Sequence, residues 1–515
     1  MESQEISLPS PYPWQREAMN IWEAKGKHGI VKVATGAGKT VFALLCALKQ
    51  PEPTRIKIVV PTIALSRQWK KFIQTYHIPG GIGEWNGERH SFGDYRFMIY
   101  VIDSARFSLS THILSDMKQN RPVMVIYDEC QRYGSEYNRK IFHFLKAPSF
   151  RKDLYFSLGL SATPDCAYFH EVISPSIGDI VFDYDLNKAE EDKLVNPYFL
   201  FHIGVSFHAK ERADYLELTD KISVLQRKIL NRFTILRTLD EIEFFRAIEK
   251  KSEEGEEDCT LLVNLTYRRN SLVENASSRI ECARDLVLSL DRRKRIILFC
   301  ERIEQTIALK KLLTDASLTR ICLYHSEMSE QARKISLDNF SQGEGRILLC
   351  CKALDEGLNV PDADVGIVVS STKSERQRIQ RLGRVLRSKE GKDITCLYYI
   401  HVHGTNDPNI YLESNRSALR IFEFTYASGA FDNDAYFDLA EDFFSSLAFS
   451  PSADLPERKQ KVRKCLELGA IRGDGYLPAS SLLEKKDQAF TEDERFYYDV
   501  MAKLSSFREK EKEDR

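Results

Sequence analysis

The stretch VKVATGAGKT, residues 31–40, decides the fold of the first part of the chain. Two valines lead into a glycine-rich turn that ends in Lys-Thr. A glycine loop between a strand and a helix presents backbone N–H groups to phosphate oxygens, and its lysine reaches the β- and γ-phosphates. We therefore predict a nucleotide cradle, with Thr40 as a Mg²⁺ ligand, built from Gly36, Ala37, Gly38, Lys39 and Thr40.

The cradle departs from the usual GxxxxGK[ST] pattern, because Val33 stands where the first glycine is expected. An ordinary glycine turn that opens a helix is the alternative. A second feature favours the nucleotide: the apolar run at 123–127 ends in Asp128 and Glu129. Adjacent acids at the end of a buried strand are costly unless a cation lies there. We predict that Asp128 holds Mg²⁺, that Glu129 orients water, and that the chain hydrolyses ATP.

Length and composition limit the remaining possibilities. A chain of 515 residues is too long for one compact core, so we expect several domains. The formal net charge of −1 means that a nucleic-acid partner would have to be met by local basic patches. The sequence has neither a membrane span nor a signal peptide, which predicts a cytoplasmic protein, or a nuclear one in a eukaryote. Eleven scattered cysteines without a CxxC pair favour reduced, buried thiols.

Apolar runs alternate with amphipathic stretches in two sets, which predicts two α/β units with parallel sheets covered on both faces. The first set is IVKVA, IKIVVP, FMIYVI, VMVIYDE and YFSLGLSA, and the second is RIILFC, ICLYHS, GRILLCC, VGIVVSS and ITCLYYI. Apolar residues at helical spacing predict a helical insert between the two units. These residues are Leu218, Ile222, Leu225, Ile229, Phe233 and Leu236.

The second unit lacks a glycine–lysine cradle but carries an arginine-rich run, SERQRIQRLGRVLRSK, at residues 374–389. Arg384 and Arg387 lie three residues apart, so they share one face if this run is helical. They are candidate arginine fingers that reach the γ-phosphate across a cleft, and the alternative is a solvated basic helix. Such a cleft would close with ATP and open after hydrolysis.

Taken in order, the motifs resemble those of superfamily-two helicases and translocases. PWQREA resembles the adenine-reading Q motif, ATGAGKT motif I, VVPTIALSRQW motif Ia, VIDSAR motif Ic, DECQ motif II and LSATP motif III. HSEMSEQAR, ALDEGLNVPDAD and QRLGRVLR resemble motifs IVa, V and VI. The ordered match, from Pro13 to about Arg387, implies two tandem RecA-like domains with ATP bound at the cleft between them.

Several motifs look most like those of the XPB-like and restriction-motor group of DNA helicases, which carries a helical insert at this place. Motif II departs from the group by reading DECQ, so Gln131 can hydrogen-bond across the cleft but cannot become cationic as histidine does. The likeness begins almost at the N-terminus, so we expect the damage-recognition domain of XPB-like proteins to be missing. The sequence carries no convincing nuclease carboxylate–lysine pattern, so we expect any cutting to belong to a partner.

The resemblance assigns further residues to the two ligands. For the ATP site, the resemblance implies that Gln15 of the Q motif reads adenine. It also implies that Gly357 of motif V and Gln380 of motif VI belong to this site. The residues expected to face the nucleic-acid strand or to couple it to ATP are Pro61, Thr62, Arg67, Ser104, Ser161, Thr163, His325 and Ser326. A surface ion pair for Arg67 and a satisfied loop histidine for His325 are the alternatives.

These expectations divide the chain into a RecA-like domain at 1–205, a helical thumb-like insert at 206–275, a second RecA-like domain at 276–405 and a helical C-terminal extension at 406–515. The predicted function is an ATP-dependent DNA helicase or translocase in repair, recombination or defence against foreign DNA. An RNA helicase or sensor is one alternative. A nucleic-acid-stimulated ATPase that switches a partner is another, because the aromatic C-terminal extension is either core or a docking surface.

Overall fold

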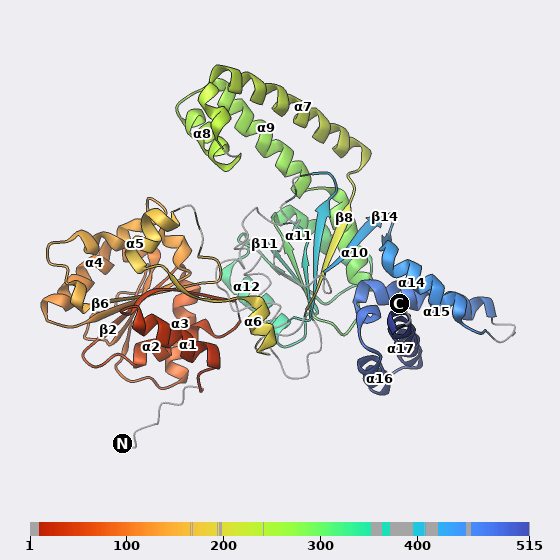
Figure 1. The fold of residues 1–515 in the computed structure, drawn as a ribbon, viewed down its shortest axis with the longest axis horizontal. Coiled ribbons are helices and arrows are strands. Elements are labelled where there is room, and N and C mark those ends of the chain that lie inside the picture. The colour runs from red at the N-terminus through yellow and green to blue at the C-terminus, as the bar shows by residue number, and fades with distance from the viewer. Residues whose placement is uncertain are drawn as a thin grey trace. The chain divides into compact units, whose positions relative to one another are not determined.

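The computed structural model describes residues 10–513, apart from residues 35, 165, 167, 193, 195–197, 240, 352–362, 371–394, 406, 408–420 and 450–454. The described residues form two compact units, and the second begins at Tyr198. Each unit contains one large sheet that is mostly or wholly parallel (Figure 1). The predicted pair of α/β units is therefore confirmed.

The first unit contains a seven-stranded parallel sheet in the order β3-β4-β2-β5-β6-β1-β7. Its strands are β1 His28–Val33, β2 Arg55–Val60, β3 Ile82–Trp85, β4 Phe97–Val101, β5 Val123–Asp128, β6 Tyr155–Ser161 and β7 Ile180–Tyr184. The predicted apolar runs form the inner strands, and the structure adds β3 and β7 at the two edges. Because all strands run the same way, their carboxyl ends share one edge of the sheet.

Helices cover both faces of this sheet (Figure 1). They are α1 Pro13–Ala24, α2 Lys39–Leu48, α3 Ile63–Thr75, α4 Ile102–Lys118, α5 Ser174–Ile177 and α6 Leu186–Glu191. On the face covered by α4 and α5, fully buried Leu109 and Ile113 belong to one core cluster with Val125 and Tyr127 of β5. The opposite face carries α1, α2 and α3. Helix α1 contains the Q motif, α2 follows the nucleotide turn and α3 begins within motif Ia.

The second unit contains an eight-stranded sheet in the order β10-β11-β9-β12-β13-β8-β14-β15, which is parallel except for the β14–β15 hairpin. Its strands are β8 Tyr198–Val205, β9 Ile296–Cys300, β10 Ile321–Tyr324, β11 Ile347–Cys351, β12 Val365–Val368, β13 Thr395–Val402, β14 Ile421–Ala427 and β15 Ala430–Asp432. The predicted domain boundary at residue 205 is wrong by one strand, because β8 pairs with β13 and β14 in the second sheet.

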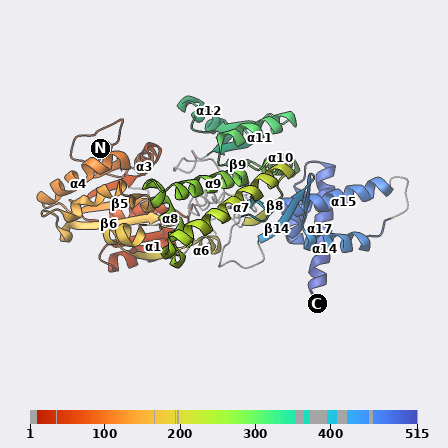
Figure 2. The same cartoon turned by 90° about the horizontal axis from the view of Figure 1, so that it is seen from above.

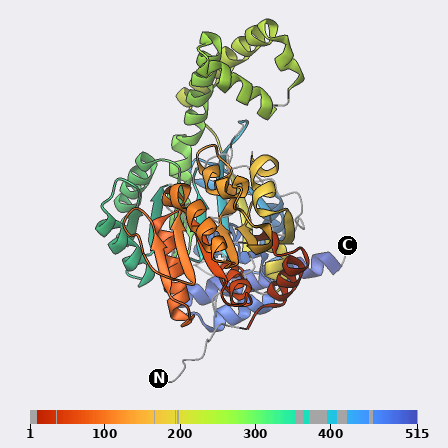
Figure 3. The ribbon, with the colours of Figure 1, turned by 90° about the vertical axis from the view of Figure 1, so that its left-hand side faces the viewer.

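The insert consists of three helices, α7 Ala209–Arg232, α8 Glu241–Glu253 and α9 Glu257–Glu274. Figures 1 and 2 both show α7 and α9 side by side, and Figure 3 shows the same helical arm from another direction. The insert has its own buried core, to which all three helices contribute, with Ile229, Ile248 and Leu262 fully buried. The residues predicted at helical spacing lie in this core, with Phe233 packed against it.

The remaining helices of the second unit are α10 Ser277–Ser289, α11 Ile303–Asp315, α12 Glu330–Ser341, α14 Asp434–Ser446, α15 Leu455–Arg472, α16 Ala479–Asp487 and α17 Glu492–Glu513. The C-terminal extension is mainly helical, as predicted, but β14 and β15 precede these helices and lengthen the sheet. Its aromatic residues Phe424, Tyr426, Tyr436 and Phe443 are buried. They form core, which removes them from any docking surface.

Two further findings concern the whole described chain. Among the described residues, no helix combines the length and the apolar character that crossing a membrane requires. All eleven cysteines fall within the described part, none of them forms a disulfide, and all except Cys166 are buried. Burial disfavours the thiolate form, so these side chains serve the packing of the core.

Candidate functional site

The glycine turn joins the end of β1 to the start of α2 in the first unit. Gly36 and Gly38 have φ values of 95° and 99°, a left-handed conformation that glycine adopts without strain. The first backbone bond of the helix runs from the N–H of Phe42 to the carbonyl of Gly38, at 3.1 Å. The start of an α-helix directs N–H groups and the positive end of its dipole outward, so the start of α2 suits a phosphate.

Gln15 of the Q motif is fully buried beside this turn. Its Nε2 donates to the Gly38 carbonyl at 3.1 Å, and its Oε1 accepts from the Tyr12 N–H at 2.9 Å. Because both ends of the amide bind backbone groups, Gln15 positions the turn. The role of adenine reader assigned to it remains a prediction. The Tyr12 ring lies against the same turn and is 46% exposed.

The structure brings the predicted lysine and acids together at the carboxyl end of β5. Lys39 Nζ lies 3.1 Å from Glu129 Oε1, and both side chains are mostly buried. Gln131 Nε2 donates to the other oxygen, Glu129 Oε2, at 2.8 Å. Gln131, which departs from the family pattern, thus holds Glu129 within the first unit. Glu129 itself has φ 53°, a backbone strain of the kind found at functional sites.

The two acids have opposite electrostatic surroundings. Burial, followed by the nearby charge of Glu129, raises the pKa of Asp128. Burial alone would raise the pKa of Glu129 too, but the charge of Lys39 and the hydrogen bonds from Gln131 and Lys39 lower it. Asp128 is thus the carboxylate that gains most from a bound cation. With the Thr40 hydroxyl at the start of α2, it supplies the oxygen ligands that Mg²⁺ prefers, so these residues fit the metal.

Asp128 has a partner that the sequence reasoning missed. Trp69, which is 1% exposed, donates its indole Nε1–H to Asp128 Oδ2 at 2.8 Å. Trp69 lies on α3, the helix whose N-cap is Thr62. A buried tryptophan N–H normally finds an acceptor, and Trp69 follows Thr62 by seven residues, two helical turns. The tryptophan in motif Ia could therefore have been predicted to need a buried acceptor, and the carboxylates of motif II are candidates for it.

Motif III lies on the strand between the glycine turn and the acids. β6 pairs with β5, where Leu160 is opposite Asp128, and with β1, where Ser161 is opposite Lys32. Ser161 is buried, and its Oγ accepts from the N–H of Thr163 at 2.9 Å. The end of β6 thus lies between β1, which leads into the glycine turn, and β5, which ends at the acid pair.

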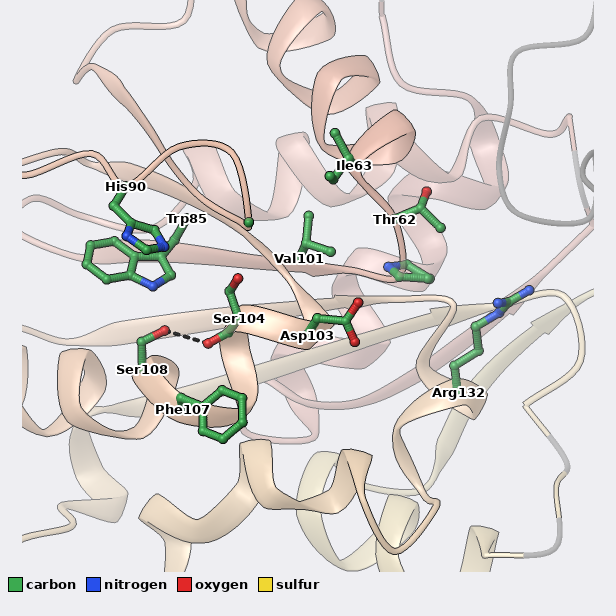
Figure 4. Close-up of a pocket in the computed structure, with 12 residues that line it drawn as sticks. Thr62, Ile63, Trp85, His90, Val101, Asp103, Ser104, Phe107, Ser108 and Arg132 are labelled. Atoms are coloured by element: carbon green, nitrogen blue, oxygen red, sulfur yellow. Dashed lines mark hydrogen bonds between the residues drawn. The ribbon is translucent and has the colours of Figure 1, made fainter. Parts of the chain in front are cut away.

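The first unit also contains a pocket of about 920 Å³, lined in part by the starts of α3 and α4 (Figure 4). It contains three of the residues assigned to the nucleic-acid strand: Pro61, Thr62 and Ser104. The Thr62 hydroxyl accepts from the Leu65 N–H at 3.3 Å and so caps α3. The lining residues to which the sequence reasoning assigned no role include Trp85, Phe107 and Arg132.

The comparison with known proteins identifies the family. Over 397 residues the chain is 30% identical to the DNA 3′-5′ translocase XPB2 of Sulfurisphaera tokodaii, an alignment that covers 76% of this chain and 82% of the relative. The chain belongs to the XPB-like helicase family. The predicted resemblance is therefore confirmed. Another relative, the DNA 3′-5′ helicase XPB of Kineococcus radiotolerans, is 25% identical over 407 residues, covering 77% of this chain and 60% of the relative.

Family models match both units of this XPB-like helicase. Residues 8–166 match the type III restriction enzyme res subunit, and residues 278–389 match the helicase conserved C-terminal domain. The crystal structure of the DUF1998 helicase MrfA bound to DNA shares the fold, with a TM-score of 0.50 at 14% identity over 77% of this chain and 46% of that one. The chain is an ATP-hydrolysing helicase, as predicted.

Other predicted site residues of the XPB-like helicase are not among those that line the pocket at the starts of α3 and α4. Arg67 forms an exposed ion pair with Glu88, at 3.0 Å, and is absent from the pocket lining. His325 is buried after β10 in the second unit, and its Nδ1 has no hydrogen-bond partner among the described residues. Ser326, next to it, is exposed. Four predicted residues lie outside the described residues: Gly357, Gln380, Arg384 and Arg387.

Proposed function

We propose that this chain is a motor that moves along DNA and is driven by ATP hydrolysis at the glycine turn of the first unit. The observation that carries the proposal is the run of contacts from Lys39 through Glu129 to Gln131, at 3.1 and 2.8 Å, next to a turn built to receive phosphate. The relatives named above are a DNA translocase and a DNA helicase, which favours DNA over RNA. We propose a location in the cytoplasm, or in the nucleus of a eukaryote, because DNA is found there.

In this proposal the N–H groups of the turn and of the start of α2 receive the phosphates, while Gln15 holds the turn in place. Lys39 moves from Glu129 to the β- and γ-phosphates, because the phosphates carry more negative charge than one carboxylate. Thr40 and Asp128 would hold Mg²⁺, which neutralises phosphate charge when it is bound. Phosphate binding thereby separates the ion pair that the structure shows.

Once Lys39 has moved, Glu129 keeps the hydrogen bond from Gln131. This bond keeps the carboxylate aimed while it orients the attacking water and accepts its proton. A neutral glutamine can hold Glu129 in this way both before and after Lys39 moves, since the bond depends on an amide N–H and not on a positive charge. The departure at Gln131 is therefore compatible with hydrolysis.

The nucleic-acid strand is proposed to lie in the pocket at the starts of α3 and α4, where backbone N–H groups and the Thr62 and Ser104 hydroxyls suit phosphates. The helix α3 reaches from this pocket to the ATP site, because Thr62 caps it and Trp69 bonds to Asp128. A shift of α3 on strand binding would change the position of the carboxylate. Strand and ATP affinities would then be linked.

By family resemblance, we infer that motifs V and VI contribute Gly357, Gln380, Arg384 and Arg387 to the same ATP site. Its own sheet, in the described part of the chain, carries no glycine–lysine turn. One ATP per chain, bound by the first unit and contacted by arginines of the second, is the arrangement we propose. The docking of a partner through the C-terminal extension stays a proposal. Four of the aromatic residues that motivated it are buried core, and the other four are partly exposed: Phe422, Phe431, Phe437 and Phe444.

The test measures ATP turnover with single-stranded DNA, duplex DNA, forked DNA and RNA of matched sequence as stimulants. We expect DNA to stimulate more strongly than RNA, and a strand-displacement assay on the forked substrate to show ATP-dependent movement. Equal or stronger stimulation by RNA would favour the RNA helicase, since only the 2′-hydroxyl and the base methyl differ. Stimulated turnover without displacement would favour an ATPase that switches a partner. Lys39→Ala provides the inactive control.

A further inference from the structure

An aromatic wall lines the pocket opposite the helix starts. Trp85, at the end of β3, stacks on His90 with ring centroids 4.5 Å apart and planes 17° apart. The two residues also form an antiparallel bridge, and the turn between them is held by Asn86 Oδ1, which accepts from the N–H groups of Glu88 and Arg89 at 2.9 Å. The stacked pair is therefore held in place before any ligand arrives (Figure 4).

Phe107 brings a second ring to the same pocket. It lies on α4 away from the buried stripe of that helix, and it is 72% exposed. Phe92, which meets the Trp85 ring edge-on at 5.4 Å, is 80% exposed. A single exposed phenylalanine needs no explanation, but the three rings that line this pocket, Trp85, His90 and Phe107, indicate a binding surface. Figure 4 shows Phe107 and the Trp85–His90 pair on different sides of the pocket.

The other wall identifies the chemistry of the ligand. Pro61, Thr62 and Ile63 come from the start of α3, and Asp103 and Ser104 come from the first turn of α4. Helix starts favour anions, and the Asp103 carboxylate is paired with Arg106 Nη2 at 2.7 Å. Anion-binding groups beside flat rings match a polynucleotide, whose phosphates and bases alternate. A cavity of about 920 Å³ is large enough for small-molecule ligands of nucleotide size.

We propose that Trp85 and Phe107 form a base-stacking subsite for single-stranded nucleic acid. The inference rests on the proposed function, because it takes the strand to lie in this pocket. Bases within a duplex are stacked on both faces, so only an unpaired or flipped base can offer a face to these rings. The subsite therefore adds a preference for single strands to a grip on phosphates, which by itself does not distinguish them.

Intrinsic fluorescence tests the subsite directly, because Trp85 is the one partly exposed tryptophan of the four, all of which are described. The other three are buried: Trp14, Trp22 and Trp69. An oligothymidylate added to the full chain should quench the fluorescence and shield the remaining emission from acrylamide. In Trp85→Phe the oligonucleotide should still bind, as measured by anisotropy of a label on the DNA, but without quenching.

Affinity provides the second measurement. Phe107→Ala should weaken oligothymidylate binding by about five- to a hundredfold, the range found for losing one stacked base, and should leave the affinity for blunt duplex DNA nearly unchanged. Replacing single thymidines by abasic sites should weaken binding to the wild-type chain at one position or more. The same replacement should cost the Phe107→Ala chain less. Phe490→Ala, which removes an 86% exposed ring from the second unit, is the matched control and should change neither affinity.

Three results would overturn the inference. They are equal losses for single-stranded and duplex DNA in Phe107→Ala, unchanged affinity in both Phe107→Ala and Trp85→Ala, or oligothymidylate binding to the wild-type chain without quenching. These results are distinct from failure of the proposed function, in which the wild-type chain would bind no nucleic acid and its ATP turnover would not respond to any. A lower melting temperature of Phe107→Ala would mean that the ring is structural, and the abasic-site comparison on the folded fraction would then decide.

Discussion

The two sheets use the charged groups at the carboxyl ends of their strands in different ways. In the first unit, Lys39 and Glu129 form a pair that retains some solvent access, with 12% and 16% of the side chains exposed. In the second unit, Arg279 is 1% exposed and pairs with the fully buried Asp407. Its Nη1 also donates to the Val369 and Ile400 carbonyls, near the ends of β12 and β13.

Arg279 also connects this edge to the insert, because its Nε donates to the Val273 carbonyl of α9 at 2.8 Å. Nearby, the Ser370 hydroxyl donates to Gln305 Oε1 at 2.6 Å and accepts from the Glu301 N–H at 2.9 Å. The second sheet thus uses the polar groups of its edge to hold its own parts together. The comparison teaches that, among the described residues, the charged pair at this edge keeps some contact with solvent in the first sheet, whereas in the second sheet it is buried and holds backbone carbonyls.

The largest expected effect comes from removing the positive charge of Lys39 at the carboxyl edge of the first sheet. Lys39→Ala should reduce ATP hydrolysis to background, because it takes away the cation placed to meet the β- and γ-phosphates. The fold should survive, as measured by thermal melting. Glu129→Gln is the matched comparison: it should also hydrolyse slowly, yet retain bound ATP and hold nucleic acid longer. Wild-type turnover in folded Lys39→Ala would show that the glycine turn is not the ATP site.

The next largest effect concerns the contribution of the second unit to the chemistry. Arg384→Ala and Arg387→Ala should each leave ATP binding largely intact and slow turnover, by about three to five decades if one arginine acts alone. Single-turnover hydrolysis beside nucleotide binding would separate the two effects. If both single variants and the double variant turn over at the wild-type rate, motif VI is a solvated helix and the second unit contributes framework alone.

Removing the buried ion pair of the second sheet should lower the free energy of unfolding and should not change ATP hydrolysis. Arg279→Ala leaves the Asp407 carboxylate buried without its partner, which should lower the free energy of unfolding by about 3–5 kcal/mol. Arg293→Ala is the control, since its ion pairs with Asp291 and Glu494 are partly exposed and should each contribute at most about 1 kcal/mol. Chemical denaturation measures both. Equal stability of the two variants would contradict the framework role.

A smaller effect is expected from the link between pocket and ATP site. Trp69→Phe removes the hydrogen bond to Asp128, a loss of about 1.5–3 kcal/mol at most for a bond to a charged group. DNA should then stimulate ATP turnover less, while basal turnover persists. Trp22→Phe is the matched control, because it removes an equally buried indole N–H from the Ser157 carbonyl. An identical loss of stimulation in both variants would reduce the Trp69 effect to general destabilisation.

The smallest effect tests whether motif III also couples DNA binding to ATP hydrolysis. Changing Ser161 and Thr163 together to Ala removes two hydroxyls, each contributing about 0.5–1.5 kcal/mol. ATP binding and basal hydrolysis should remain, and DNA stimulation and unwinding should fall. Titration of DNA against ATP turnover in this variant and in Trp69→Phe ranks the two routes. Unchanged stimulation and unwinding would leave coupling to α3 and to motifs V and VI.

How far the sequence predicts the structure depends on whether a feature is local. The glycine turn and the acid pair were predictable because each is a short motif whose chemistry requires those residue types. The strand β14 was missed although its alternation of Phe422, Phe424 and Tyr426 with other residues has the period of a strand. The dense aromatic content around it was instead taken as helical.

Contacts between distant segments were not predictable in the same way. Nothing within YFLFHIGV tells whether β8 joins the sheet before it or the sheet after it, because both are apolar and parallel. The bond from Trp69 to Asp128 depends on how α3 packs on the sheet. Trp85 and Phe107 meet in one pocket only because β3 and α4 are neighbours in space. Arg279 likewise lies in an ordinary amphipathic stretch that shows no sign of its buried partners.

The position of β8 has a consequence for how the chain folds during synthesis. The first sheet is complete once β7 has been made, at residue 184. The strand β8 pairs only with β13, which starts at residue 395, and with β14. At translation rates of about 5–20 residues per second, it stays without its neighbours for roughly 10–40 seconds. Throughout that interval an apolar strand with both edges unpaired follows the first sheet out of the ribosome, so among the described strands β8 waits longest for its partners.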